Sequence, residues 1–322
     1  MLGTRFARVV SMLLVLATGL LGRTPAGATA PGTNGRIAYS RFAGQHADIV
    51  SANSDGTGVA KLTSGPAGTF DLNPDWSPDG TRIAFERDAG ASQAIFVMNA
   101  DGSGPRQITF DPFPGDMDPS WSPDGTRIAV ERFDSAAGRD GIYIMNADGS
   151  HQTQVTQSDA LLGENEEPQW SPDGTKLVFE AANDTKGHAL FTVNLDGTGE
   201  RRLTPWSIDA VHPDWSPDGR SIVFEAPDRD DAPPGTPANV YTIRADGSHL
   251  TAVTHYQGGT VNAVNAAWAP DGRKIVFVQI PGSGPFGNAD IFTMNADGSA
   301  IRQVTTSTLF DFRPDWGTAP LN

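Results

Sequence analysis

The chain of 322 residues contains no cysteine. This absence excludes a disulfide scaffold, a thiolate metal site, a cysteine nucleophile and a lipid-anchored N-terminal cysteine. Histidine is also scarce, with six residues, and no two of them stand at the short spacing that places two imidazoles on one metal ion. The sequence therefore predicts no metal ion and no cofactor, and we assign no catalytic residue.

Positive charge is in deficit, with 23 Lys and Arg against 38 Asp and Glu and a net charge of −15. A chain this acidic does not attract a phosphate backbone, so no nucleic-acid partner is expected. Two enzyme motifs also fail. The G-x-S-x-G elbow of serine hydrolases does not occur, and the G-x-G-x-x-G stretch at 282–287 contains a proline and opens no helix, which excludes a dinucleotide-binding loop.

Long apolar runs are missing except near the N-terminus. There, Arg5 and Arg8 precede an apolar run at 9–21, and small residues follow it. This order is typical of a Sec-type signal peptide, and the run is short for a membrane span. We interpret residues 1–28 as a cleaved signal peptide and 29–35 as a short linker, with a retained membrane anchor as the alternative. The mature chain is then exported to the periplasm or the extracellular space and has no membrane span.

Glycine and proline are abundant, with 36 and 24 residues, and many of them belong to a repeat. Six tryptophans recur 45 to 53 residues apart, and five of them open the motif W-[SA]-P-D-G. Each unit also contains a turn motif x-x-D-G and ends on an aliphatic residue followed by threonine. The six tryptophans are Trp76, Trp121, Trp170, Trp215, Trp268 and Trp316.

Short β-rich runs lie between these turn motifs, so each unit predicts four short strands. A period of this length with four strands is typical of a β-propeller blade. The chain begins with three strands and no tryptophan strand, and it ends with a tryptophan strand at 310–316. We therefore predict an all-β fold, a six-bladed β-propeller of four-stranded blades over residues 36–317, with a C-terminal tail at 318–322. The C-terminal strand pairs with the N-terminal blade and closes the ring, which disfavours the alternative of an open solenoid.

The order W-S-P-D-G, apolar run, N-A-D-G and R-Q-[IV]-T resembles the repeat of the TolB-like propeller family, over about residues 36–317. The resemblance implies the propeller fold and, as one possible role, a cell-envelope scaffold that works with a lipoprotein. TolB carries an α/β domain ahead of its propeller, whereas here the first expected strand begins within about ten residues of the expected cleavage point. The part implied to dock the inner-membrane partner is therefore not found, and a fold alone does not fix a function.

A candidate binding face follows from the expected connectivity. The short P-D-G and D-G turns share one face because the strands alternate in direction, and the loops of variable length lie on the other face. The first strand of each blade lines the channel, so the residue three before each tryptophan lies near the channel mouth on the variable-loop side. All six are polar, and they are our candidate ligand-binding residues: Asn73, Asp118, Glu167, His212, Asn265 and Arg313. Neighbouring acids form a secondary set: Asp71, Asp116, Glu164, Glu166, Asp209 and Asp311.

Charge is unevenly distributed in this ring. Asp118 and Glu167 make one side acidic, and Arg313 is expected to take a carboxylate of the ligand because its guanidinium matches that group in two parallel hydrogen bonds. A tunnel mouth of mutually satisfied polar groups is the alternative. Four glutamates close the second strand of consecutive units, and we interpret them mainly as structural, some of them pairing with the following Arg87 or Arg132. They are Glu86, Glu131, Glu180 and Glu225.

The patterns favour binding over catalysis, because they contain no catalytic constellation and no second domain. We predict an exported, monomeric, non-enzymatic module that recognises a protein, peptide or glycan at the face with the variable loops. Two alternatives stay open: a polysaccharide lyase or lactone hydrolase acting at the channel mouth, and a TolB-like envelope scaffold with a lipoprotein partner.

Overall fold

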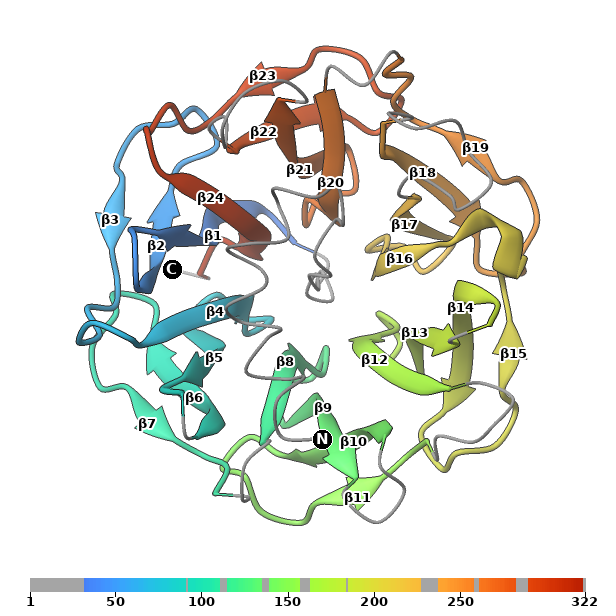
Figure 1. The fold of residues 1–322 in the computed structure, drawn as a ribbon, viewed down its shortest axis with the longest axis horizontal. Coiled ribbons are helices and arrows are strands. Elements are labelled where there is room, and N and C mark those ends of the chain that lie inside the picture. The colour runs from blue at the N-terminus through green and yellow to red at the C-terminus, as the bar shows by residue number, and fades with distance from the viewer. Residues whose placement is uncertain are drawn as a thin grey trace.

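The strands form six blades around a central axis (Figure 1). The computed structural model describes residues 32–90, 92–110, 115–134, 139–156, 163–183, 185–226, 237–257, 261–281 and 289–320. Within these ranges the helical structure is one 3₁₀ turn, η1 (Trp206–Ile208), and the rest of the regular structure is β-strand. No helix of the described ranges has the length and apolar character needed to cross a membrane. The predicted all-β, six-bladed propeller is confirmed.

Each blade contains four strands, which run antiparallel from the axis outward. With the innermost strand first, blade 1 contains β24 (Phe310–Thr318), β1 (Asn34–Phe42), β2 (Ala47–Ala52) and β3 (Ala60–Lys61). Blade 2 contains β4 (Phe70–Trp76), β5 (Arg82–Asp88), β6 (Gln93–Asn99) and β7 (Arg106–Gln107). Blade 3 contains β8 (Asp116–Trp121), β9 (Arg127–Asp134), β10 (Arg139–Asn146) and β11 (Thr153–Gln154). Blade 4 contains β12 (Glu164–Trp170), β13 (Lys176–Asn183), β14 (Gly187–Asn194) and β15 (Arg201–Arg202). Blade 5 contains β16 (Val211–Trp215), β17 (Ser221–Ala226), β18 (Asn239–Arg244) and β19 (Thr251–Ala252). Blade 6 contains β20 (Val261–Trp268), β21 (Lys274–Pro281), β22 (Asp290–Asn295) and β23 (Arg302–Gln303).

The ring is closed by the last strand. β24 pairs antiparallel with β1, with Trp316 opposite Ile37 and Phe310 opposite Phe42. The Ala319 N–H also donates to the Thr33 carbonyl (2.7 Å). The two ends of the chain therefore build blade 1 together, as the repeat count predicted.

The W-S-P-D-G motif recurs because its side chains fasten a tight turn. In blade 2, Ser77 Oγ donates to Asp79 Oδ1 (2.6 Å), and the Arg82 N–H donates back to Ser77 Oγ (2.9 Å). Gly80 has φ of +67°, a conformation that glycine adopts without steric cost. The turn thus sets the register between the first and second strands of a blade.

The aliphatic-Thr pair has an equally local cause. The Ile49 N–H of β2 donates to Thr63 Oγ1 (2.9 Å), and every blade repeats this bond from its third strand. The hydroxyl satisfies a buried N–H where the short outermost strand has already ended. The six threonines are Thr63, Thr109, Thr156, Thr204, Thr254 and Thr305.

The hydrophobic core lies between blades rather than inside one sheet. Trp121 of blade 3, for example, packs in one cluster with Ile95 and Val97 of blade 2 and with Ile128 and Val130 of its own blade. The strands are covered on both faces by neighbouring blades, so the second and third strands contain continuous apolar runs, such as 83–85 and 95–98. A blade is therefore stable only with its neighbours in place.

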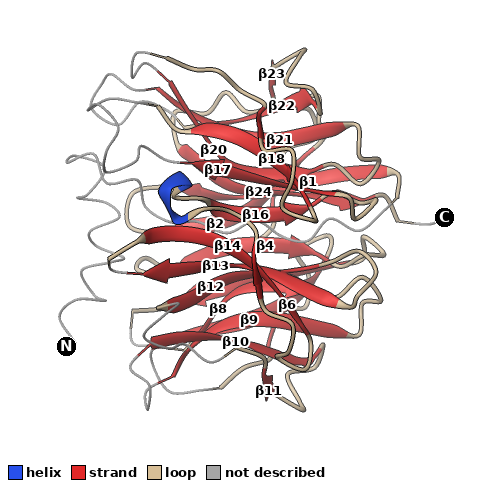
Figure 2. Cartoon of the chain, turned by 90° about the vertical axis from the view of Figure 1, so that its right-hand side faces the viewer, coloured by secondary structure: helices blue, strands red, loops and turns tan. Residues whose placement is uncertain are grey.

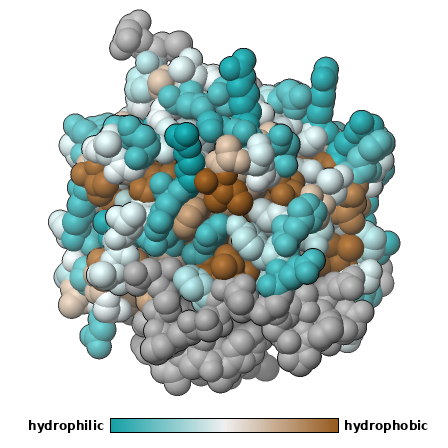
Figure 3. Space-filling view, turned by 90° about the horizontal axis from the view of Figure 1, so that it is seen from above, coloured by the Kyte–Doolittle hydropathy of each residue, from teal (hydrophilic) through white to brown (hydrophobic). Residues whose placement is uncertain are grey.

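The two faces of the disc differ in their connections. In Figure 2 the C-terminus lies on the face of the short turns, and η1 lies on the opposite face, in the connection from blade 4 to blade 5. The outer rim, seen in Figure 3, mixes apolar patches with hydrophilic columns. Its outermost strands are two residues long in each blade, and edges this short limit pairing with another chain.

Candidate functional site

Each innermost strand contains a β-bulge at the same place. In β4 the pairing with β5 shifts register between Leu72 and Asp75, and the other five blades show the same shift. The residue inside the bulge has φ between 52° and 58° in all six blades: Asn73, Asp118, Glu167, His212, Asn265 and Arg313. These are the six candidate ligand-binding residues.

The bulge places these side chains and strains their backbone. The left-handed region costs a residue with a side chain roughly 1–2 kcal/mol, and Asn, Asp and His tolerate it better than Glu or Arg. A bulge turns a side chain out of the alternation of its strand, and here the turned side chains meet across blade boundaries. The sequence predicted the positions and their polarity but not the bulge, because no residue type at these positions requires one.

Three ring residues belong to a blade 1–3 cluster, which we define as Arg313, Asn73, Asp118, Glu86 and Glu131. Arg313 Nη1 donates to Asp118 Oδ1 (3.2 Å), and Asn73 Nδ2 donates to the same oxygen and to Glu86 Oε2 (2.7 Å). Arg313 is only 8% exposed. In this structure the buried guanidinium is bound by a carboxylate of the protein itself, and the expectation that Arg313 takes a ligand carboxylate stays a prediction.

The other three belong to a blade 4–6 cluster, which we define as Glu167, His212, Glu225 and Asn265. His212 Nδ1 lies 2.5 Å from Glu225 Oε1, and His212 Nε2 lies 3.2 Å from Glu167 Oε1. The Asn265 N–H donates to the other oxygen of Glu225. All four residues are buried. Glu225 and Glu86 were assigned to structure on the sequence, yet both bind the ring residues directly.

Burial changes the proton affinities of the blade 1–3 cluster. Burial, followed by repulsion from Asp118, raises the pKa of Glu86 to about 8. Burial also raises the pKa of Asp118 to about 7, although the charge of Arg313 opposes that shift. Near neutral pH these carboxyl groups therefore retain protons that exposed acids have lost.

A second layer of acids lies one residue before the tryptophans. Asp75 Oδ2 accepts the N–H of Trp121 in the next blade (2.6 Å), and Asp214 and Asp315 accept the corresponding N–H of their next blades (2.7 Å each). Burial raises the pKa of Asp315 to about 7, and burial together with the charge of Asp315 raises the pKa of Asp75. These three residues join consecutive blades, a role that sequence analysis missed because the acceptor and donor lie 46, 54 and 239 residues apart in the chain.

Three acids of the secondary set are bound by arginines of the paired strand. Asp71 accepts two bonds from Arg87, at 2.6 and 2.8 Å. The carboxylates are fully buried and the arginines partly exposed. The three pairs, in blades 1, 2 and 3, are Asp311–Arg41, Asp71–Arg87 and Asp116–Arg132.

These pairs overturn one expectation. Glu86 and Glu131 do not use the arginine that follows each of them, because successive residues of a strand point to opposite faces. Glu86 instead accepts from Asn73, and Asp118 is hydrogen-bonded to Glu131. The arginine that follows Glu86 is Arg87, which binds Asp71.

The remaining secondary acids lie in two places. Glu166 is buried opposite Glu180 of β13, and Glu164 is half-buried at the start of β12. Asp209 lies outside the ring, directly after η1, with φ of 55°. Its Oδ1 accepts the backbone N–H of His188 (2.7 Å) and lies 2.5 Å from His188 Nδ1. Asp209 therefore fixes the start of blade 5 against β14.

Much of the variable-loop face falls outside the described residues, at 111–114, 157–162, 227–236 and 282–288. Among the residues that are described, no group of three His, Asp or Glu side chains has the geometry to hold a metal ion. The described part of the site is thus an axial network of buried charges. It can hold protons and present polar groups, and the absence of a metal stays a prediction.

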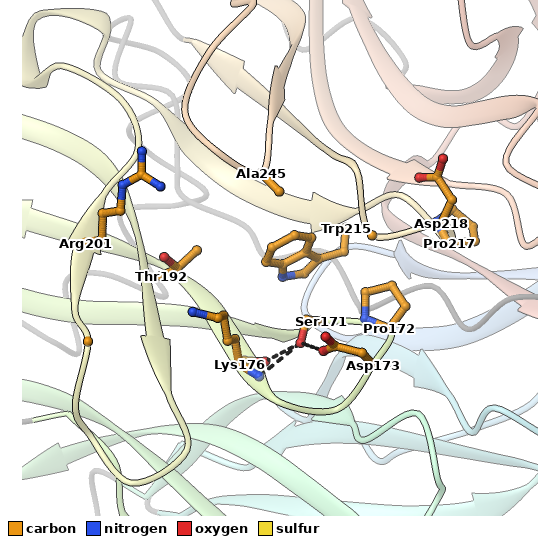
Figure 4. A pocket seen from close by; sticks show the side chains of 12 residues that line it. Ser171, Pro172, Asp173, Lys176, Thr192, Arg201, Trp215, Pro217, Asp218 and Ala245 are labelled. Carbon is orange, nitrogen blue, oxygen red and sulfur yellow. Dashed lines mark hydrogen bonds between the residues drawn. The ribbon is translucent and has the colours of Figure 1, made fainter.

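A cleft of about 520 Å³ lies between blades 4 and 5 on the short-turn face (Figure 4). Lys176 and Arg201 lie on one side of Trp215, and Pro172 and Pro217 lie on the other. Sequence analysis did not predict this cleft.

The cleft opens where a repeated contact changes. Arg82 lies over the ring of Trp121 at 4.5 Å, and Arg127 lies over the ring of Trp170 at 4.6 Å. Lys176 stands at the same position of the next blade and is exposed. An arginine therefore stacks over the tryptophan at the junctions of blades 2 and 3 and of blades 3 and 4, whereas the junction of blades 4 and 5 has a lysine at that position.

The closed ring of four-stranded blades and its axial network define the class, a six-bladed β-propeller with polar side chains gathered at the axis. A model of the TolB β-propeller domain matches residues 24–162 and 157–316. The chain therefore belongs to the TolB β-propeller family.

Solved structures agree on the fold. The chain is similar to TolB from Acinetobacter baumannii, with a TM-score of 0.72, 20% identity, and coverage of 88% of this chain and 67% of that chain. It is also similar to a nidogen/laminin complex (TM-score 0.65, 9% identity, 88% and 98% covered) and to an oligogalacturonate lyase in complex with manganese (0.54, 17%, 86% and 75%). At these identities the likeness concerns the fold alone. Among curated proteins, none matches the chain.

Proposed function

We propose that this TolB-like propeller is a non-enzymatic binding module that recognises a protein or peptide segment at the axial end carrying the variable loops. The observation that carries the proposal is the chemistry of the bulges. One strained backbone position is repeated in six blades, yet its side chains are Asn, Asp, Glu, His, Asn and Arg. Strain of this kind is often stored at functional sites, and a repeat kept only for packing would not need six polar side chains at one level.

The similar solved structures support this choice without deciding it. One of them is a complex of nidogen with laminin, and another is a lyase with manganese. The acidic balance of the mature chain and the surplus of carboxylates at the axis favour a partner segment with a cationic part. A glycan is the alternative ligand for the same face, and a lipoprotein of the cell envelope is the partner implied by the family resemblance.

The location of the protein is part of the proposal. Arg5, Arg8 and the apolar run at 9–21 support a Sec-type signal peptide over residues 1–28, with export to the periplasm or outside the cell. The mature module is proposed to be monomeric. Mass spectrometry of the exported protein tests the cleavage, because an intact Met1 would contradict it.

The proposed face is tested by capture and titration. Purified mature protein is used to capture partners from envelope extract, and the captured partner is then titrated by calorimetry. Glu167→Gln should weaken binding by at least ~1 kcal/mol, about fivefold. Matched controls on the short-turn face, Lys176→Ala in the cleft and Asp148→Ala in a turn, should leave binding unchanged. If the controls lost binding and Glu167→Gln kept it, the binding site would lie on the short-turn face and the proposed face would be wrong.

A further inference from the structure

One imidazole joins three blades at the axis. His212 of β16 contacts Glu225 of β17 through Nδ1 (2.5 Å) and Glu167 of β12 through Nε2 (3.2 Å). Glu225 in turn accepts the backbone N–H of Asn265 in β20. The four residues are no more than 3% exposed. The bulges of blades 4, 5 and 6 are thus connected through a single side chain.

This connection needs two protons on the ring. An ionised carboxylate only accepts hydrogen bonds, so while Glu167 and Glu225 are both ionised, both nitrogens of His212 must donate for both contacts to be favourable. Neutral imidazole has one N–H, and its other nitrogen would then turn a lone pair towards a carboxylate. The doubly protonated form is therefore the one that fits this geometry.

The groups around His212 are almost all acidic at this end of the strands. Glu167 of β12 and Glu225 of β17 contact it. The strands packed against β16 also carry Glu164 and Glu166 in β12, Lys176 and Glu180 in β13 and His188 in β14, and β16 itself carries Asp214. β20 carries no titratable residue between Val261 and Trp268. Burial raises the pKa of Glu225, and the charge of His212 opposes that shift. The imidazolium and its two carboxylates thus stabilise one another.

The bonds of His212 also hold strained backbone. Glu167, His212 and Asn265 have φ of 57°, 52° and 53°. Each of these conformations persists only while its surroundings fix it. In blades 1–3 the corresponding bulges are held by Arg313, whose charge does not depend on pH in the range where proteins are folded.

We propose that His212 is a proton-operated clasp, which holds the bulges of blades 4–6 when its ring carries two protons and releases them when it loses one. Release removes the bond between His212 and Glu167 and lets the bulges at Glu167 and Asn265 relax, while the half of the ring held by Arg313 stays in place. The inference goes beyond the proposed binding function and does not depend on any partner.

The test is a pH titration of the wild-type mature protein by NMR. The nitrogen shifts of a ¹⁵N-labelled imidazole report one or two protons on His212. Amide exchange, corrected for its intrinsic pH dependence, reports the Asn265 N–H that binds Glu225. The control amide is Val240 of β18, in the blade of His212, whose N–H donates to the hydroxyl of Thr254 (2.9 Å) and to no titratable group.

We expect two protons on His212 at low pH and, as pH rises through its titration, at least a tenfold loss of protection at Asn265 with Val240 unchanged. In His212→Gln the protection of Asn265 should no longer depend on this titration, whereas His188→Gln, at a partly exposed histidine, should behave as wild type. The clasp is refuted if His212 loses its proton while Asn265 keeps its protection. It is equally refuted if His212 keeps two protons at every pH at which the protein is folded. Should His212→Gln not fold, the wild-type titration decides alone.

Discussion

The two halves of the ring stabilise the buried carboxylates near the axis in different ways. In blades 1–3 a buried aspartate of the inner strand is bound by an arginine opposite it, as in Asp71–Arg87, and Arg313 adds a further fixed charge. In blade 4 the same two positions hold Asn165 and Ala181. Blade 6 has Ala263 and Gln279 there.

The difference shows how a repeat can vary without losing its fold. Both halves share the bulge, the tryptophan and the turns, so these features belong to the scaffold. The charge pattern is free to differ because it lies at the axis, apart from the apolar clusters that pack one blade against the next. In blades 1–3 the axial charges are those of Arg313, which stays charged, and of Glu86 and Asp118, whose pKa values are raised by burial. In blades 4–6 they are those of His212 and the two glutamates that it contacts.

The largest expected effect comes from the fixed charge. Arg313→Met should lower the free energy of unfolding by about 3–5 kcal/mol, because removing one partner of a buried ion pair leaves Asp118 uncompensated. Chemical denaturation measures the change. Arg220→Met is the control, at an arginine that is 86% exposed and 3.9 Å from its carboxylate, and it should cost less than ~0.5 kcal/mol. Equal effects in the two variants would remove the basis of the comparison.

A change of a few kcal/mol is expected with pH. The pKa values of Glu86 and Asp118 are raised in the folded protein to about 8 and about 7. Groups of this kind bind more protons in the folded than in the unfolded state, so the free energy of unfolding should fall as pH rises from about 5 to about 8. The turn aspartates such as Asp79, whose pKa is lowered, complete their contribution below this range.

Two variants with a neutral side chain test which half of the ring causes this dependence of the free energy of unfolding on pH. Glu86→Gln should flatten it, and Glu225→Gln should change it less, because His212 offsets the burial of Glu225. Denaturation curves at several pH values give the slopes. A free energy of unfolding that rises with pH in the wild type over this range would contradict the raised pKa values.

A smaller effect is expected at the junctions between blades. Arg82→Ala should cost about 1 kcal/mol, the typical strength of a partly buried cation–π contact, because Arg82 lies over Trp121. Lys176→Ala, at the same position beside the cleft, should cost less than ~0.5 kcal/mol. Thermal melting of the two variants compares them directly, and equal losses would show that the lysine covers Trp215 as well as the arginine covers Trp121.

The smallest effect is a gain. After each D-G-[ST] turn one residue has positive φ, and it is Gly104 in blade 2 but Ala300 in blade 6, with φ of 62° and 55°. Ala300→Gly should raise the free energy of unfolding by roughly 0.5–1 kcal/mol by removing strain. Gly104→Ala is the reverse control, since a methyl group there meets no atom closer than 3.5 Å. Stabilisation by both substitutions would rule out backbone strain as the cause.

The fold could be predicted from the sequence because its signals are local. The serine and aspartate of W-S-P-D-G fasten their own turn, and the complementary ends at Ile37 and Trp316 predicted the closure. The candidate ring was predicted by position alone. Its pairing could not be, because Asn73 and Asp118 are 45 residues apart and meet only through the curvature of the ring and the bulge. Asp209 was expected beside the ring but lies outside it. The repeat pattern misplaced it because η1 interrupts the repeat just before this residue.

Closure by the last strand also sets an order of events in time. The side chains of Arg41 and Asp311 pair across 270 residues of chain, and Trp316 Nε1 donates to the Gly35 carbonyl across 281. Loop-closure entropy must be overcome before such distant contacts stabilise the fold. During synthesis the N-terminal strands emerge first, so β1 waits with its inner edge unpaired until β24 arrives. Arrival of the final strand, rather than completion of any single blade, is therefore the step that commits the chain to a ring.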